Sequence, residues 1–466
     1  MNRWQILLLV GFVPWLFVLT LCSSPMHAPF RDTSYLKDVP PKLHADEAVQ
    51  WSLAKDSAAG VPYSDNQDKF HGPALAVAAK VVLAVRGLSF DDATQEDLQL
   101  VPFWFYLLIC AAPLGLRGVS KPARFLASTL LLLSSAGCYF GHYFIQEPLL
   151  VAGFVWGVLL WLQSAGGERP AWWALFSGAA FGLSLACKVT AAAYLGILLL
   201  TLLVFARETL SWRRVGWATL GAVVIWVSLQ TVLFTDWEGM IAWGHQLWRS
   251  FAVASGNEDT LVLTNPGYWW TVGLWLAALV GIRLVRGGQR SAEDVPLALA
   301  VGCFLFHLAL PYKTPWLLFL PVCLSLTMVW PVLAEGRVWT WAACFAGANL
   351  FVLASCNILQ RHSATHSQLY QRLEEIAAVR TAWEKQYPGR PFYIAVEGGH
   401  YWPLPYYLRK YQVGYGEFAG SEKAAIRFLP ALNRPEPKVR GYANYFIHLR
   451  SDDPYWMLVD ASVVPK

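Results

Sequence analysis

Ionisable side chains gather in a few short stretches of a chain that is otherwise poor in charge. The first stretch is Leu43-His-Ala-Asp-Glu-Ala-Val-Gln-Trp51, which follows the first apolar run, residues 5–22. Asp46 and Gln50 are four residues apart and share one face of a predicted helix. His44 lies one step before that helix, and Glu47 lies beside Asp46. A carboxylate placed in this way can act as a general base for a hydroxyl group. The alternative is that both acids only offset the dipole of the helix.

Two further stretches carry candidate residues between apolar runs. Asp65, Asp68 and His71 precede the turn Gly72-Pro73, and Glu147 lies in His142-Tyr-Phe-Ile-Gln-Glu-Pro148. The aspartates are equally compatible with a solvated loop, whereas His71 is more constrained by the turn. For Glu147 the alternative is a solvated turn at a membrane boundary.

Two lysines provide the complementary charge. Lys188 lies between alanine-rich apolar stretches without an acidic neighbour in sequence, and Lys313 follows Tyr312 in Tyr-Lys-Thr-Pro-Trp316. An ionisable group in such a place faces a polar cavity or extends to the membrane surface. Because acids activate hydroxyl nucleophiles and cations hold phosphate, the combination favours transfer of a group from a lipid phosphate.

The composition is that of an integral membrane protein. Hydrophobic residues make up 56% of the chain and charged residues only 14%, against about 25% charged in a soluble domain. Apolar runs long enough to span a bilayer recur along the chain. We predict eleven spans, near 5–22, 101–117, 123–141, 148–163, 171–186, 190–206, 215–235, 267–286, 295–311, 314–332 and 337–357.

Basic loops indicate which way the spans run. Arg117–Arg124, Arg207–Arg214 and Arg283–Arg290 fall on one side only if the weaker apolar segment 73–90 does not cross the membrane. We therefore predict that 73–90 is a helix at the membrane surface within a first outer loop, residues 23–100. The N-terminus is then cytoplasmic, and all the stretches described above lie outside. A cleaved signal peptide ending near Ala28 is the alternative for the first run.

The last part of the chain has a different character. Residues 1–357 form the predicted membrane domain, and residues 358–466 form a small extracytoplasmic α/β domain. Leu369, Leu373, Ile376 and Trp383 have helical spacing, whereas 391–396, 445–449 and 456–459 are typical of strands, and 402–411 of a short helix. The candidate acceptor contacts here are Glu397, His400, Trp402 and Arg409; alternatively, Trp402–Tyr407 packs this domain onto the membrane.

The cysteines argue against a disulfide-linked protein or one with a cysteine-bound metal, and the net charge argues against a nucleic-acid-binding one. The eight cysteines lack metal-site spacing and lie in or at the end of apolar runs, so we predict neither a disulfide nor a metal site from them. The net charge of +5 reflects membrane topology rather than a nucleic-acid surface.

Several motifs resemble a known family. His-x-Asp-Glu-Ala at 44–48, Phe70-His-Gly-Pro73, Lys313-Thr-Pro-Trp316 and Tyr401-Trp-Pro-Leu-Pro-Tyr-Tyr-Leu-Arg409 are similar to those of the flippase-activity-associated multipass proteins. That family is similar to the dolichyl-phosphate-mannose protein mannosyltransferases and belongs to the GT-C glycosyltransferase superfamily.

The resemblance implies an inverting glycosyltransferase that uses a polyprenyl-phosphate sugar. Asp46, with Glu47 beside it, would be the general base, and Glu147 would match the family's second acidic position. Lys188 or Lys313 would hold the donor phosphate, with His44, Gln50, His71 and Tyr312 as further substrate contacts. The chain has Gln50 where the family often has a second histidine, and it lacks the Glu-Asn that accompanies the family's lysine.

Two alternatives to an enzyme stay open at this point. One is a non-catalytic partner or subunit of a lipid-linked-sugar flippase, and the other is a scaffold whose outer domain binds a glycan or a protein. Transporters usually bury charges near the midplane and show repeated halves, which this sequence does not. The partners predicted are the donor, membrane lipids and a protein, lipid or glycan acceptor. No cofactor is assigned, and a divalent cation stays an open alternative.

Overall fold

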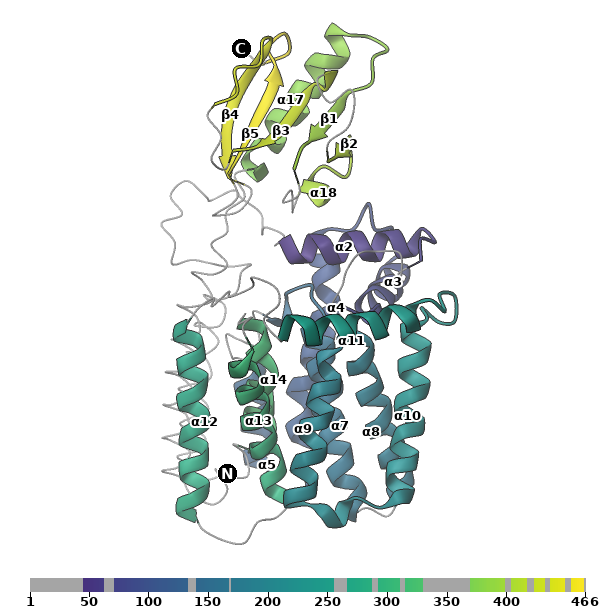
Figure 1. The fold of residues 1–466 in the computed structure, drawn as a ribbon, viewed down its shortest axis with the longest axis vertical. Helices are drawn as coiled ribbons and strands as arrows, with labels where there is room; N and C mark the ends of the chain where they lie inside the picture. Colours follow the sequence, from purple (N-terminus) through teal and green to yellow (C-terminus); the bar gives the residue numbers. More distant parts are fainter. Residues whose placement is uncertain are drawn as a thin grey trace.

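The structure is a helix bundle that carries a layer of short helices and a sheet domain at one end (Figure 1). It is a computed structural model, and it describes residues 45–62, 71–132, 140–166, 169–254, 266–286, 292–310, 315–329, 369–398, 404–416, 423–431, 436–448 and 454–464.

The bundle consists of long apolar helices that run roughly parallel or antiparallel (Figure 1). They are α4 (Gln95–Ala111), α5 (Lys121–Leu132), α7 (Glu147–Gly166), α8 (Pro170–Cys187), α9 (Thr190–Phe205), α10 (Trp212–Gln230), α12 (Pro266–Arg286), α13 (Val295–Ala309) and α14 (Phe319–Leu324). The turn η2 (Ala112–Gly115) extends α4, η3 (Arg207–Thr209) precedes α10, and η4 (Ala292–Asp294) precedes α13. The turn η5 (Pro315–Leu318) precedes α14, and η6 (Ser325–Val329) follows it.

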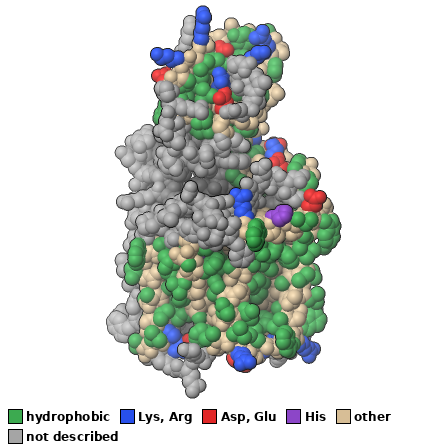
Figure 2. Space-filling model, in the orientation of Figure 1, with side chains coloured by type: hydrophobic (Ala, Val, Ile, Leu, Met, Phe, Trp, Pro, Cys, Tyr) green, Lys and Arg blue, Asp and Glu red, His purple; other side chains and the backbone are tan. Residues whose placement is uncertain are grey.

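These helices make the chain an integral membrane protein. Within the described residues, Gln95–Gly115, Glu147–Gly166, Pro170–Cys187 and Ala292–Ala309 are long and apolar enough to cross a bilayer, and three shorter apolar helices accompany them. The spans predicted at 5–22 and 337–357 lie outside the described residues, so the number of about eleven stays a prediction. Figure 2 shows hydrophobic side chains covering the flank of the bundle.

Small residues allow the central helices to approach closely. A Cβ added at Gly178 of α8 would lie 1.8 Å from the carbonyl oxygen of Ala218 in α10. On its other side α8 is joined to α7, because the Ser184 hydroxyl donates a 2.8 Å hydrogen bond to the carbonyl of Leu150. In lipid the hydrophobic effect does not drive helices together, because the lipid tails are as apolar as the helix surfaces. Close packing and interhelical hydrogen bonds of this kind hold them together instead.

Three short helices form what we call the head layer: α2 (Ala45–Ala58), α3 (Ala74–Arg86) and α11 (Gly239–Ala254), lying between the bundle and the sheet domain (Figure 1). A helix at 73–90 was predicted; α3 ends four residues earlier, at Arg86, where Gly87 caps it with a φ of 67° that suits glycine. Its position at the membrane surface stays a prediction. The region 236–266, between the spans predicted at 215–235 and 267–286, was interpreted as a loop. It contains α11, in which apolar residues recur at helical spacing.

The C-terminal domain is a helix packed on a five-stranded mixed sheet of order β2-β1-β3-β5-β4. The elements are α17 (Leu369–Gln386), β1 (Tyr393–Val396), α18 (Leu404–Tyr407), β2 (Gln412–Tyr415), β3 (Ile426–Pro430), β4 (Tyr442–His448) and β5 (Pro454–Asp460). Strand β1 pairs in parallel with β2 and β3, and β5 pairs antiparallel with β3 and β4. The helix and three of the strands were predicted; β2 and β3 were not.

The segment 71–73 is fixed directly against the end of α8. His71 and Lys188 form an isolated antiparallel bridge, and the Gly72 amide donates a 2.8 Å hydrogen bond to the Cys187 carbonyl. A Cβ added at Gly72 would lie 2.0 Å from the carbonyl oxygen of Ala186. Only glycine therefore permits this approach of two backbones.

We expect Gly72→Ala to destabilise the protein by ~1–3 kcal/mol, because backbone atoms of α8 cannot move aside as a side chain would. The measurement is the thermal unfolding midpoint in detergent. Gly244→Ala in α11 is the matched control, since nothing lies within 4 Å of a Cβ added there. Equal midpoints for both variants would contradict this packing.

Candidate active site

The buried carboxylate of Glu47 joins the head layer to the bundle. It is only 2% exposed, and its Oε1 accepts a 2.9 Å hydrogen bond from the Phe144 amide and a 3.3 Å bond from Nε2 of Gln99. A buried charge is tolerated only when such donors satisfy it. Glu47 thus holds α2 against the start of α4 and against the segment 140–146, which precedes α7.

The buried amide of Gln146 extends this polar network. Its Nε2 donates to the Gly72 carbonyl at 2.8 Å and to Oε1 of Gln50 at 3.2 Å, while its Oε1 accepts from the Leu75 amide at 3.3 Å. One side chain therefore connects α2, the segment 71–73 and the start of α3. Sequence reasoning missed Gln146; its place beside Glu147, between two apolar runs, was the available signal.

Glu147 and Lys188 form an ion pair at the same end of the bundle. Their Oε1 and Nζ atoms are 2.8 Å apart, and the side chains are only 7% and 10% exposed. Glu147 is the first residue of α7, and Lys188 is the C-cap of α8. Each charge therefore lies at the end of its helix where the dipole stabilises it.

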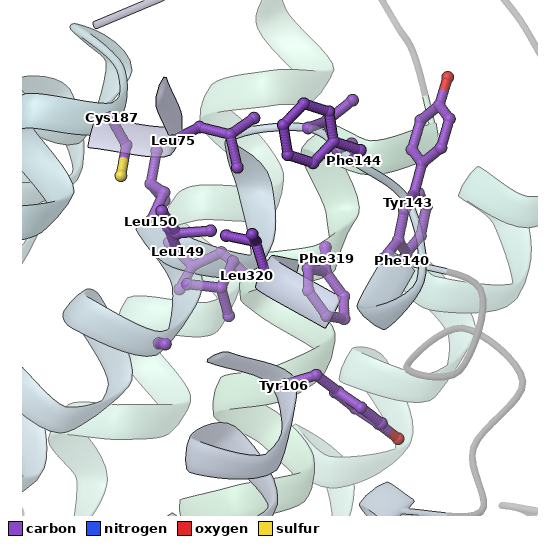
Figure 3. Close-up of a cluster of buried hydrophobic side chains, with 14 of the residues drawn as sticks. Leu75, Tyr106, Phe140, Tyr143, Phe144, Leu149, Leu150, Cys187, Phe319 and Leu320 are labelled. Carbon is purple, nitrogen blue, oxygen red and sulfur yellow. The ribbon is translucent and has the colours of Figure 1, made fainter. Parts of the chain in front are cut away.

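The ion pair opens onto a small cavity in the bundle. Apolar side chains from α7 and α14 form much of its wall, and the full lining is Glu147, Leu150, Val151, Lys188, Thr190, Tyr194, Trp316, Leu317 and Leu320. Figure 3 shows Leu150 and Leu320 within the surrounding cluster of buried apolar side chains, which also contains Phe140 and Phe319 with ring centroids 5.0 Å apart. The cavity is thus lined mainly by apolar side chains, with the charged pair on one side of it.

A second buried pair, of which Tyr194 lines this cavity, was not predicted from sequence. The Tyr194 hydroxyl and Nε2 of His307 are 2.5 Å apart, and the two residues are 3% and 0% exposed. Tyr194 belongs to α9 and His307 to α13, so no local pattern connects them. Each had been interpreted only as part of an apolar run.

The predicted site residues fall into three groups: those brought together at the head layer, those in the sheet domain, and those whose side chains are not described. Glu47, Gln50, His71, Glu147 and Lys188 come together at the head layer through the contacts described above. Asp46 is the second residue of α2 and directly precedes Glu47. The Asp46 side chain, together with His44, Tyr312, Lys313, His400 and Trp402, lies outside the described residues; Trp316, three residues after Lys313, lines the cavity.

Arg409 contacts the head layer from the sheet domain, away from the cavity. Its guanidinium lies 4.1 Å from the centre of the Tyr406 ring, and its Nε donates a 3.3 Å hydrogen bond to the Asp91 carbonyl. Tyr406 in turn packs edge-on against Trp51 of α2, with centroids 5.3 Å apart. Burial in this contact raises the pKa of the Tyr406 phenol, and the Arg409 charge opposes that shift.

Glu397 lies at the end of β1 and forms a 2.7 Å ion pair with Arg427 of β3. This pair joins two neighbouring strands inside the sheet domain, and neither residue contributes to the cavity lining. The structure therefore brings Glu397 to a different place from the carboxylates of the head layer.

A divalent cation does not fit the described side chains. No group of three or more His, Cys, Asp or Glu side chains able to hold a metal occurs in the described part of the chain. Glu47 already accepts two hydrogen bonds, and Glu147 is paired with Lys188. We therefore derive no step through a metal.

The fold is similar to that of ArnT from Cupriavidus metallidurans. The crystal structure bound to undecaprenyl phosphate matches with a TM-score of 0.63 at 14% sequence identity, over 99% of both chains. The apo structure matches with a TM-score of 0.58 at 14% identity, over 98% of this chain and 99% of that one. The apo oligosaccharyltransferase of Archaeoglobus fulgidus matches with a TM-score of 0.51 at 10% identity, over 87% of this chain and 64% of that one.

The comparison confirms a mostly helical multispan membrane fold with a C-terminal mixed sheet, like that of ArnT. No protein-family model matches the sequence. No curated protein sequence matches it either. The finer resemblance to the flippase-activity-associated family therefore stays a prediction.

The buried ion pair predicts non-additive effects on stability. Glu147→Gln and Lys188→Met should each destabilise the protein by ~3–5 kcal/mol, because either change leaves an uncompensated buried charge. The double variant should be more stable than either single variant. The readout is the thermal unfolding midpoint of all four proteins in one detergent; additive losses would contradict the pairing.

Proposed function

We propose that this protein is an inverting glycosyltransferase that moves a sugar from a polyprenyl-phosphate donor to an acceptor hydroxyl. The observation that carries the proposal is the buried Glu147–Lys188 pair at one cavity, in a fold shared with an ArnT structure that holds undecaprenyl phosphate. Gln146, directly before Glu147, connects this pair to α2 through Gln50. A membrane-borne donor and a water-borne acceptor can meet at such a boundary.

Lys188 is suited to hold the donor phosphate. An ammonium group has three N–H donors, and one of them is directed to Glu147. An ammonium group can bond a phosphate oxygen as well as a carboxylate, so a bound phosphate need not replace Glu147. Lys313 is the second candidate, because the segment that contains it reaches the cavity at Trp316.

Asp46 is the proposed general base. It takes the proton of the acceptor hydroxyl, whose oxygen attacks C1 of the donor sugar and forms the new glycosidic bond. The bond from C1 to the phosphate oxygen breaks, and its electron pair leaves with the phosphate. Attack from the side opposite the leaving group inverts C1. Glu47 supports this arrangement by fixing the first turn of α2 through Phe144 and Gln99.

Charge distribution supports an extracytoplasmic site. α9 starts beside the cavity at Thr190, so its far end and Arg207 lie at the opposite end of the bundle. Lys and Arg side chains are visible at that end in Figure 2. Basic loops favour the cytoplasm, so the head layer and the sheet domain face outward in the proposed topology, in an inner or plasma membrane.

The decisive variant is Asp46→Asn. We expect its transfer rate to fall ~100- to 10,000-fold, as is typical for loss of a general base, while the fold is kept. The assay follows labelled sugar from a panel of polyprenyl-phosphate donors to protein, lipid and glycan acceptors, using purified protein. Asp56→Asn is the matched control, because it removes a carboxylate from the same helix ten residues away.

Full activity of Asp46→Asn would refute the base assignment. If the unchanged protein binds a lipid-linked sugar but turns over no donor, the flippase-partner alternative replaces the transferase.

A further inference from the structure

The Tyr194–His307 pair has an unbalanced set of hydrogen bonds. Nε2 of His307 contacts the Tyr194 hydroxyl at 2.5 Å, whereas Nδ1 of this fully buried ring has no partner in the described part of the chain. A neutral imidazole carries its proton on one of the two nitrogens. The position of that proton decides which way the Tyr194 hydroxyl points its own hydrogen.

The proton is better placed on Nε2. If it were on Nδ1, a buried N–H donor would be left without an acceptor, and orphaned buried donors are rarer than orphaned acceptors. With the proton on Nε2, His307 donates to the Tyr194 oxygen. The Tyr194 hydroxyl also has a side-chain hydrogen bond with Thr190, which lines the cavity beside Lys188. Where the Thr190 hydroxyl donates this bond, the Tyr194 oxygen accepts from both His307 and Thr190, and its own hydrogen can serve a group in the cavity.

Tyr194 lines the cavity beside Lys188. The ring is held edge-on between aromatic neighbours, at centroid distances of 5.7 Å from Phe154 and 6.4 Å from Phe306. Packing of the ring and the contact with His307 therefore fix the position of the hydroxyl. An exposed tyrosine could change its rotamer more freely. Tyr194 thus lines the same apolar-walled cavity as the Lys188 side chain.

We propose that Tyr194 donates a hydrogen bond to a phosphate oxygen of the lipid carrier, and that His307 is the positioning residue that orients this donor. The proposal deepens the function proposed above and rests on it. A desolvated anion requires hydrogen-bond donors as well as a counter-charge, and Lys188 with Tyr194 supplies both. Glu147 does not oppose the anion as an isolated charge, since it is paired with Lys188.

The test measures binding of sugar-free polyprenyl phosphate, and of polyprenol of the same length, to purified protein. Tyr194→Phe should weaken binding of the phosphate by about tenfold to hundredfold, the usual range for a hydrogen bond to a charged group, and leave polyprenol binding unchanged. Tyr106→Phe is the matched control: it removes another buried hydroxyl, which donates to the Leu131 carbonyl outside the cavity lining.

Variants of His307 separate positioning from packing. His307→Gln can place an amide N–H where Nε2 lies and should retain phosphate binding, whereas His307→Leu should lose it to the same extent as Tyr194→Phe. The double variant Tyr194→Phe/His307→Leu should be no weaker than either single variant. A merely structural role would make Gln and Leu equally harmful and would reduce polyprenol binding in parallel.

Several results would overturn the proposal: wild-type affinity in Tyr194→Phe, equal losses for phosphate and polyprenol, or no phosphate binding by the unchanged protein. Because binding needs no turnover, this outcome is distinguishable from failure of the transferase proposal. Selective loss in Tyr194→Phe, in a protein that transfers no sugar, would support the phosphate site and refute the transferase.

Discussion

The arrangement of the candidate site depends on satisfying buried polar groups where irregular backbone meets helix ends. Gln146 does most of this, because its amide serves the Gly72 carbonyl, the Leu75 amide and Gln50 at once. Without such a partner, the backbone of segment 71–73 would be buried with unpaired groups, which is costly in an apolar environment. The position of α3, and the fit of His71 against Lys188, follow from this interaction.

The ion pair between Glu147 and Lys188 has a different role. A buried pair contributes little net stability compared with apolar packing, but loss of one partner is costly. The two charges therefore constrain each other, and they hold the ammonium group at the cavity. In the proposed reaction this cation is in place before the donor arrives.

The sheet domain is tied to the site through α2. Trp51 packs against Tyr406 and donates a 2.9 Å hydrogen bond to the Phe90 carbonyl, while Arg409 reaches the Asp91 carbonyl. The same helix carries Asp46 and Glu47 at its start. The sheet domain therefore packs against the helix that carries the proposed base.

The sequence by itself determined the membrane class, most helix positions and the placement of Glu147 and Lys188 at the ends of apolar helices. These properties depend on composition and on patterns that repeat within a few residues. The tertiary structure alone decided which groups meet: Glu47 accepts from Phe144 across 97 residues, and Tyr194 contacts His307 across 113. Strands β2 and β3 were missed for a related reason, since short strands are stabilised by their neighbours in the sheet. A local pattern records which face of a helix is polar, but the partner of a buried donor is set by how distant segments pack.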